Sequence, residues 1–320
     1  MNILIAGGTG QVGAILRRAF EARGDSVTLL CRNQTAQPGC ETVHWDGKTL
    51  GSWTACLDET DVLINLCGRS VNCRYTKRNR REILESRVDT TAVLLRALQK
   101  SVTPPKVWLQ ASTATIYSHR FDRANDELEG EIGGRELDVP ESWRFSIEVA
   151  KRWEAAATAA SLPNTRVVLM RSALILSPDR GGIFDMLLHL VRLGVGGRAG
   201  SGRQFVSWIH ENDFIAAVLW LITHSELSGP VNLAAPNPLP NQDFMETLCR
   251  AWGKKFALAG PAWLLPIAAY CMRTETELIL KSRRVVPTRL IQSNFGFTYP
   301  AWPEAARELC ERWLSETRPQ

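Results

Sequence analysis

The first thirteen residues, MNILIAGGTGQVG, constrain the fold of this chain more than any other stretch. Asn2 to Ala6 form a short apolar run, and Gly7, Gly10 and Gly13 follow it at three-residue spacing before a helical pattern begins. A strand, a glycine turn and a helix start in this order are typical of a dinucleotide site, because the glycines allow a sharp turn, close approach of a pyrophosphate and tight helix–strand packing. The pyrophosphate would then sit on free N–H groups at the helix N-terminus. The alternative is an ordinary glycine turn, and the preceding N-terminal strand favours the dinucleotide site.

The residue that follows the second expected strand, at 26–31, bears on the choice between NAD and NADP. Many NAD sites have an acidic residue here for the ribose 2′-hydroxyl, but this chain has Arg32 and Asn33. A carboxylate would repel a 2′-phosphate, whereas an arginine pairs with it bidentately. One charged hydrogen bond of ~1.5–3 kcal/mol corresponds to roughly a ten- to hundredfold preference. The sequence therefore predicts NADP(H), and the alternative is a surface arginine at a strand end.

Further buried strands alternate with helical patterns along the chain. We expect strands at 42–45, 61–66, 106–110, 166–176 and 206–209, and helices at 77–100 and 147–160. This alternation predicts an α/β fold, a Rossmann-type doubly wound parallel sheet. Ligands bind at the carboxyl ends of such strands, which places Leu66, Cys67 and Gly68 at the site. Asp46 either reaches an adenine there or serves as a turn residue, and the sequence does not decide between the two.

The fifth strand is followed by ASTATIY, which places Ser112 and Thr113 where they could touch a nicotinamide or a substrate carbonyl. The same small residues also suit a tight turn. Residues 118–143 are polar and acidic, and their length is typical of a lid, with a simply solvated loop as the alternative. The glycine-rich segment 194–205 contains Arg198 and Arg203, and we interpret it as a mobile loop at the cleft.

Prolines separate short segments after Pro236, which predicts a smaller, mainly helical C-terminal substrate lobe. We therefore divide the chain into an NADP-binding domain at 1–235 and a substrate lobe at 236–320. Just before this boundary, His210 and Asp213 are expected to cap a helix that begins near Asn212. We expect a structural role for His210, because no carboxylate–histidine–nucleophile set accompanies it.

Composition argues against several other classes of protein. The net charge of +5 is mild, and the one basic cluster, at 77–81, reads as the solvated face of a helix start or as an anion contact. The eight cysteines form no C-x-x-C pair, which predicts neither a disulfide framework nor a metal site. The N-terminus lacks the basic flank of a signal peptide, and the apolar run at 262–272 contains Pro266 and is too short to span a bilayer. These features predict a cytoplasmic protein that binds neither nucleic acid nor membrane.

Taken together, the motifs resemble the extended short-chain dehydrogenase/reductase superfamily. GGTGQVG matches its glycine motif, and STATIY at 112–117 is similar to the segment that carries its catalytic Ser or Thr, here Thr113. More closely, the chain resembles the atypical "epimerase family" of sugar-nucleotide epimerases, some of them labelled cell-division inhibitors. The matching pieces are INLCG at 64–68, ESRVDTT at 85–91, KRWEAAA at 151–157, GSGRQFVSWIH at 200–210 and, in the appended C-terminal domain, VVPTRLIQSNFGFTYP at 285–300. The resemblance covers essentially the whole chain.

The resemblance implies NADP(H) binding on the sheet and a small-molecule substrate, such as a nucleotide sugar, between the lobes. The cofactor contacts expected from the turn, the strand ends and the resemblance are Gly7, Thr9, Gly10, Gln11, Val12, Cys31, Arg32, Leu66, Cys67, Gly68, Glu82, Arg87 and Ile175.

The chain departs from the superfamily at its catalytic Tyr-x-x-x-Lys pair. The corresponding region, RFSIEVAKRWE, places Ser146 and Ala150 at these positions, and the alternative register gives Ile147 and Lys151. Losing a general acid/base costs roughly 10²–10⁴ in rate, so ordinary dehydrogenase chemistry does not follow from the resemblance. Tyr117 is the alternative proton donor that the sequence offers.

Two functions remain open from the sequence. In the first, the protein is an NADP(H)-dependent oxidoreductase or epimerase. Thr113 or Ser112 would bind the reacting oxygen, and Tyr117 or a water would handle the proton. Arg198 and Arg203 would hold a substrate phosphate or carboxylate. In the second, favoured by the missing pair, it is a non-catalytic NADP(H)-binding redox sensor or scaffold. The sequence determines neither the substrate, nor the reaction direction, nor the oligomeric state.

Overall fold

A seven-stranded parallel sheet forms the centre of the molecule. The structure, a computed structural model, describes residues 1–33, 40–136, 139–255, 257–258 and 277–315. The sheet has the order β10-β6-β5-β4-β1-β2-β3. Its strands are β1 (Asn2–Ala6), β2 (Ser26–Cys31), β3 (Glu41–His44), β4 (Val62–Asn65), β5 (Val107–Thr113), β6 (Arg166–Ser172) and β10 (Gly229–Leu233). The predicted doubly wound α/β fold is confirmed.

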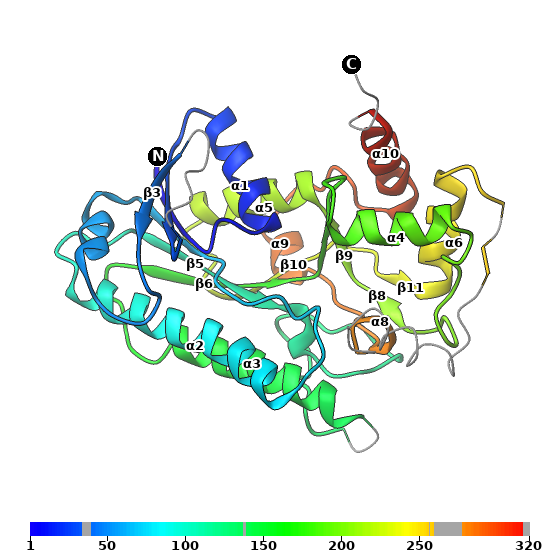
Figure 1. The fold of residues 1–320 in the computed structure, drawn as a ribbon, viewed down its shortest axis with the longest axis horizontal. Helices are drawn as coiled ribbons and strands as arrows, with labels where there is room; N and C mark the ends of the chain where they lie inside the picture. Colours follow the sequence, from blue (N-terminus) through cyan, green and yellow to red (C-terminus); the bar gives the residue numbers. More distant parts are fainter. Residues whose placement is uncertain (34–39, 137–138, 256, 259–276, 316–320) are drawn as a thin grey trace.

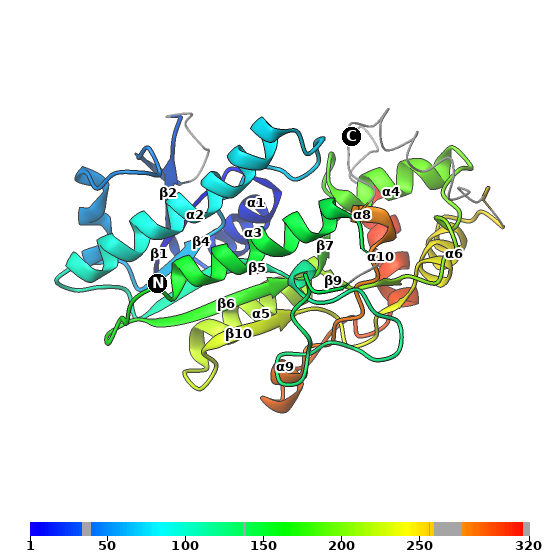
Figure 2. The same ribbon diagram turned by 90° about the horizontal axis from the view of Figure 1, so that it is seen from below.

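Helices cover both faces of this sheet (Figures 1 and 2). The helices α1 (Gln11–Ala22) and α5 (Glu211–Thr223) cover one face, and their buried side chains share one core with alternate residues of the strands. The helices α2 (Lys77–Lys100) and α3 (Glu141–Ala157) lie side by side on the other face, over a second core that also includes the short helix η1 (Ser52–Glu59). Coverage on both faces explains why the strands read as continuous apolar runs.

Several predicted boundaries differ from the structure, two of them by more than three residues or by a change of sheet. The expected strand at 166–176 is broken after Ser172, and β7 (Leu174–Leu176) leaves the central sheet to pair with β9 (Trp208–His210). From Leu174 the backbone no longer pairs with the central sheet, and Leu174 N donates to Ser207 O at 3.2 Å. Helix α3 begins at Glu141 rather than at 147, since its buried face extends upstream through Trp143.

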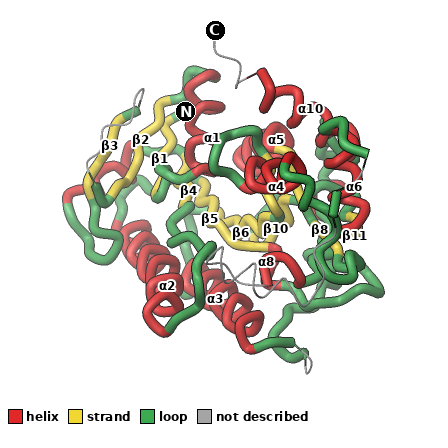
Figure 3. The backbone as a smooth tube through the Cα atoms, turned by 45° about the vertical axis from the view of Figure 1, so that its right-hand side comes forward, coloured by secondary structure: helices red, strands yellow, loops and turns green. Residues whose placement is uncertain are grey.

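The C-terminal part is mainly helical, as predicted. It contains α6 (Asn241–Ala251), α8 (Glu277–Leu280), α9 (Thr288–Gln292) and α10 (Trp302–Ser315), and β11 (Leu239–Pro240) pairs with β8 (Phe205–Val206). Helix α4 (Ile183–Arg192) packs with α6 and α10 around Trp208 and Trp302, so this third core also draws on residues before 236 (Figure 3). The predicted apolar run at 262–272 lies outside the described residues.

His210 has the structural role expected of it. Its imidazole is fully buried, accepts a hydrogen bond from Asn212 N at 3.1 Å as the N-cap of α5, and lies 2.8 Å from Glu308 Oε2. Asp213 accepts from the backbone N–H groups of Thr298 and Tyr299. Both residues therefore fasten α5 to the C-terminal segment.

Candidate functional site

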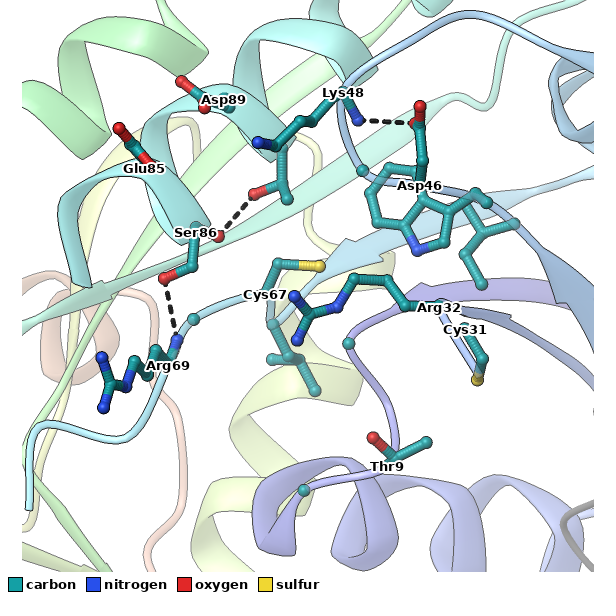
Figure 4. Close-up of a pocket in the computed structure, with 18 of the residues that line it drawn as sticks. Thr9, Cys31, Arg32, Asp46, Lys48, Cys67, Arg69, Glu85, Ser86 and Asp89 are labelled. Atoms are coloured by element: carbon teal, nitrogen blue, oxygen red, sulfur yellow. Dashed lines mark hydrogen bonds between the residues drawn. The ribbon is translucent and has the colours of Figure 1, made fainter. Parts of the chain in front are cut away.

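A pocket of about 790 Å³ opens at the carboxyl edge of the sheet, where β1, β2 and β4 end (Figure 4). The order of the sheet reverses between β1 and β4, since β2 and β3 follow β1 on one side and β5 follows β4 on the other. Crevices at such a switch point are where open α/β sheets bind their ligands. Of the predicted cofactor contacts, those that line the pocket are Gly7, Thr9, Gly10, Cys31, Arg32, Leu66, Cys67, Gly68 and Glu82.

Each glycine of the first turn meets a different requirement. Gly7 has φ +78°, and a Cβ there would lie 2.7 Å from Cys67 N. A Cβ on Gly13 would lie 2.3 Å from Gly8 O, so this glycine allows α1 to pack on the turn. A Cβ on Gly10 would meet nothing within 4 Å, because this residue faces the pocket.

Gly10 is also the N-cap of α1, and this helix start is built to accept an anion. It has no side-chain cap and no acidic residue in its first turn. The first N–H groups of a helix have no partners within it and carry partial positive charge. The turn therefore fits a pyrophosphate.

Arg32 extends from the end of β2 across the pocket toward Cys67 (Figure 4). Burial raises the pKa of the Cys67 thiol to about 12, although the nearby charge of Arg32 opposes the shift, so this pocket thiol stays protonated. Asp46 lines the pocket but acts as a turn residue. Its carboxylate accepts from Thr49 Oγ1 at 2.6 Å and from the backbone N–H groups of Thr49 and Lys48, and these bonds lower its pKa to about 2.

One face of α2 forms a wall of the pocket, and of its residues only Glu82 was predicted. Glu85, Ser86 and Asp89 also line the pocket (Figure 4), and their spacing places them on the same side of the helix. Ser86 Oγ accepts from Arg69 N at 2.9 Å and so fixes the loop after β4. Helical spacing from Glu82 would have revealed these residues.

Arg87 holds the loop after β4 and is not among the residues that line the pocket. Its guanidinium donates to Arg69 O at 3.0 Å and to Ile83 O at 3.1 Å, and a Cβ on Gly68 would lie 2.9 Å from Arg87 Cζ. Burial lowers its pKa to about 10. Gly68 therefore lets the backbone rest directly on this side chain.

The remaining predicted cofactor contacts lie outside the pocket lining. Gln11 Nε2 donates to Ser177 Oγ at 3.2 Å. Val12 and Ile175 pack against the core between the sheet and helices α1 and α5.

Two of the three predicted catalytic hydroxyls belong to one buried polar network. Ser112 Oγ donates to Glu154 Oε1 at 2.5 Å, and Arg171 donates both to this carboxylate at 2.8 Å and to Tyr117 OH at 3.0 Å. Tyr117 OH donates in turn to Asn232 Oδ1 at 3.0 Å. Burial raises the pKa of Tyr117, although Arg171 opposes the shift. These hydroxyls are thus committed to protein partners.

Thr113 is half-buried at the end of β5, and its Oγ1 accepts from Thr115 N at 3.2 Å. This contact uses a lone pair, so the hydroxyl proton is left to donate.

The two arginines predicted for substrate lie elsewhere. Both are exposed, and Arg203 lines a second cavity of about 360 Å³ with Phe121 and Phe205, while the Arg198 side chain lies beside Gly202. The described part of the chain contains no group of three or more His, Cys, Asp or Glu side chains arranged to hold a metal ion. Seven cysteines are free, and Cys271 falls in a segment that the structure does not describe.

Comparison with known proteins establishes the family. A sequence model described as "NAD dependent epimerase/dehydratase family" matches residues 3–234. The chain belongs to this family. A second model, "Domain of unknown function (DUF1731)", matches residues 261–309.

Relatives within the family match over nearly the full length. The human "Epimerase family protein SDR39U1" is 30% identical over 312 residues, 97% of this chain and 99% of the relative. Its crystal structure, described as "with NADPH", superposes with a TM-score of 0.83 over 97% of this chain and 99% of that chain, at 30% identity. A "nucleoside-diphosphate sugar epimerase" from Corynebacterium glutamicum gives a TM-score of 0.75 at 29% identity, over 97% of this chain and 58% of that chain. In the described residues, no helix is both long and apolar enough to cross a bilayer.

Proposed function

We propose that the protein is an NADP(H)-dependent oxidoreductase or epimerase that acts on a carbinol or carbonyl carbon of a small molecule, such as a nucleotide sugar. The observation that carries this proposal is the pocket at the switch point, where the uncapped start of α1 and the Arg32 guanidinium offer two anion sites. A dinucleotide with a 2′-phosphate has anions of this kind. The NADPH in the human relative's structure and the name of the C. glutamicum relative support both halves of the proposal.

Within this proposal, the residues present fit the cofactor. The turn from Gly7 to Val12 holds the pyrophosphate, and Arg32 binds the 2′-phosphate. Cys31, Leu66–Gly68 and Glu82 border the adenosine, Arg87 keeps Gly68 in place, and Ile175 supports the turn through the core. When bound, the nicotinamide supplies or accepts a hydride. The Thr113 hydroxyl donates a hydrogen bond to the reacting oxygen of the substrate, and this bond orients the substrate.

The domain division at 235/236, a lid at 118–143 and substrate contacts from Arg198 and Arg203 are part of the same proposal. Residues 118–133 are tied back by Ser118 N to Glu131 O at 2.8 Å and by Gly133 N to Ile116 O at 2.9 Å. The second cavity, which Arg203 lines together with aromatic rings, suits the phosphate end of a substrate.

The non-catalytic alternative rests on the expected loss of the Tyr-x-x-x-Lys pair, since this region reads Ser146 and Ala150 in one register and Ile147 and Lys151 in the other. Stereospecific transfer of deuterium from C4-labelled NADPH to a keto nucleotide sugar, or to any metabolite of a broad panel, separates the two functions. Transfer establishes the enzyme. Tight NADPH binding without transfer to any member of the panel would favour the sensor or scaffold.

We predict that Arg32→Ala weakens NADPH binding roughly ten- to hundredfold and leaves NADH binding unchanged, because only the contact with the 2′-phosphate is lost. Energy transfer from the eleven tryptophans to the reduced nicotinamide measures both affinities. Arg307→Ala, which removes an exposed arginine on α10, is the matched control. Equal affinity of the unmodified protein for the two cofactors would contradict the role of Arg32.

A further inference from the structure

Charged side chains from residues 277–283 are packed against the end of β5. Glu277 and Lys281 are 0% and 2% exposed. Lys281 Nζ donates to Thr115 O at 2.7 Å, and Arg283 Nε donates to Thr115 Oγ1 at 3.1 Å. Burying charges is costly, and such groups concentrate at functional sites. The C-terminal segment therefore brings buried charge to within two residues of Thr113, where the proposed function places the reacting oxygen.

A chain of hydrogen bonds leads from this cluster to a phenol. Ser146 Oγ donates to Glu277 Oε2 at 2.5 Å, and Tyr75 OH lies 3.2 Å from the same Ser146 Oγ. A serine hydroxyl has one proton to donate. Because Ser146 gives it to the carboxylate, it accepts from Tyr75. The order of donation is thus Tyr75 to Ser146 to Glu277, and Lys281 Nζ lies 3.9 Å from Glu277 Oε1.

This series of hydrogen bonds lies in the region where the superfamily has its catalytic pair. Ser146 is the residue at the tyrosine position in one of the two registers of the Tyr-x-x-x-Lys pair. The structure brings a phenol from another element within hydrogen-bond distance of it. The loop after β4 supplies this phenol, and the same loop lines the pocket at Leu66–Arg69. The same register places Ala150 at the lysine position, and the C-terminal segment brings an ammonium group, Lys281, to the cluster.

We propose that Tyr75 is the proton-transfer residue of this site and that Ser146 and Glu277 relay its proton to and from a buried carboxylate. This inference rests on the proposed function. When a substrate hydroxyl is oxidised, its O–H bond breaks and the proton passes to the Tyr75 oxygen. The Tyr75 proton passes to Ser146, and the Ser146 proton passes to Glu277, which becomes a neutral acid. The hydride that leaves the same carbon goes to the nicotinamide, and each transfer reverses when a carbonyl is reduced.

The proposal also gives the C-terminal domain a role. Glu277 and Lys281 fall within residues 261–309, the part matched by a domain of unknown function. In this interpretation the domain completes the catalytic site of the nucleotide-binding domain by inserting an acid and its counter-ion between η2 (Ala114–Ile116) and α3.

Carbon-13 labelling of the tyrosine ring carbon that bears the hydroxyl tests the relay without any substrate. The chain has four tyrosines, and Tyr75→Phe identifies the signal of Tyr75. Ser146→Ala and Glu277→Gln should each shift that signal, because each alters the hydrogen bond that the phenol makes. Tyr299→Phe, which removes a hydroxyl elsewhere, should not. A Tyr75 signal that neither Ser146→Ala nor Glu277→Gln moves would overturn the relay.

Turnover tests the catalytic role. With NADPH and a panel of keto nucleoside-diphosphate hexoses, Tyr75→Phe should lower kcat by roughly 10²–10⁴. The KM, the NADPH affinity and the melting temperature should stay near those of the unmodified protein, and Tyr299→Phe should match it throughout. Full turnover by Tyr75→Phe would overturn this proposal and leave the proposed function standing. No turnover by the unmodified protein that nevertheless binds NADPH would overturn both.

The pH profile separates a relay from a merely structural carboxylate. Glu277→Gln should remove the acid limb of the oxidation rate, and Glu277→Asp should restore part of it. If the profile keeps its shape while only the melting temperature falls, Glu277 is structural and the relay is wrong. The titratable and charged groups that face Glu277 or its counter-ion include Tyr75, Lys281, Arg283, Glu136 and His119. Burial lowers the pKa of Lys281 to about 8, which is on the alkaline side of the acid limb. Burial, together with the charge of Lys281, lowers the pKa of His119 toward the acid side, so His119→Gln is the control for this assignment. An acid limb that His119→Gln removes and Glu277→Gln leaves in place would overturn the relay.

Discussion

Arg171→Met is expected to destabilise the protein by about 3–5 kcal/mol, because it leaves the carboxylate of Glu154 buried without its cation. Arg171 and Glu154 are 7% and 9% exposed and share two hydrogen bonds of 2.8 Å. After the substitution, Ser112 would remain as the hydrogen-bond partner of that carboxylate in this network, and Tyr117 would lose a donor. Equilibrium unfolding in urea measures the change.

Two controls sharpen this experiment. Arg152→Met breaks the exposed pair of Arg152 with Glu148, whose 2.6 Å contact is shorter, yet should cost less than about 1 kcal/mol because water screens it. The double variant Arg171→Met, Glu154→Met should recover at least half of the loss, since apolar replacement of a buried pair is often neutral. A single variant as stable as the unmodified protein would show that the network contributes little to folding.

Gly10→Val is expected to weaken NADPH binding by more than about a hundredfold and to lower the free energy of unfolding by no more than about 1 kcal/mol, the cost of a poorer N-cap. A Cβ at this position meets no atom within 4 Å, and the backbone at φ −82°, ψ 175° is not in the left-handed region that requires glycine. The new side chain would, however, stand in front of the N–H groups of α1, where the pyrophosphate approaches. Fluorescence titration with NADPH and urea unfolding give the two quantities.

Two other glycines serve as comparisons. Gly13→Ala should instead cost roughly 1–3 kcal/mol of stability, because its Cβ would lie 2.3 Å from Gly8 O. Gly296→Val, at a glycine that also has nothing within 4 Å of its Cβ but lies far along the chain from the pocket residues, should change neither quantity. If Gly10→Val binds NADPH normally, the pyrophosphate does not lie on this turn.

The residues around the pocket differ in how well the local sequence pattern predicts them. The turn at 7–13 and the strand end at 31–32 are contiguous in sequence, so the residue types alone indicated what they could bind, and the structure places both at one pocket. The face of α2 was within reach by helical spacing. Arg87 was predicted as a cofactor contact, but its packing against the backbone at Gly68 could not be read from the sequence.

The sequence by itself determined the doubly wound sheet, the glycine turn, the absence of an acid after β2 and the family resemblance, because apolar periodicity and short motifs are local. Tertiary structure alone decided which hydroxyls share a network. Tyr75 meets Ser146 across 71 residues, and Ser146 meets Glu277 across 131. It also committed Tyr117 to Asn232, 115 residues away. Such contacts depend on how distant segments pack together, and no local spacing encodes them.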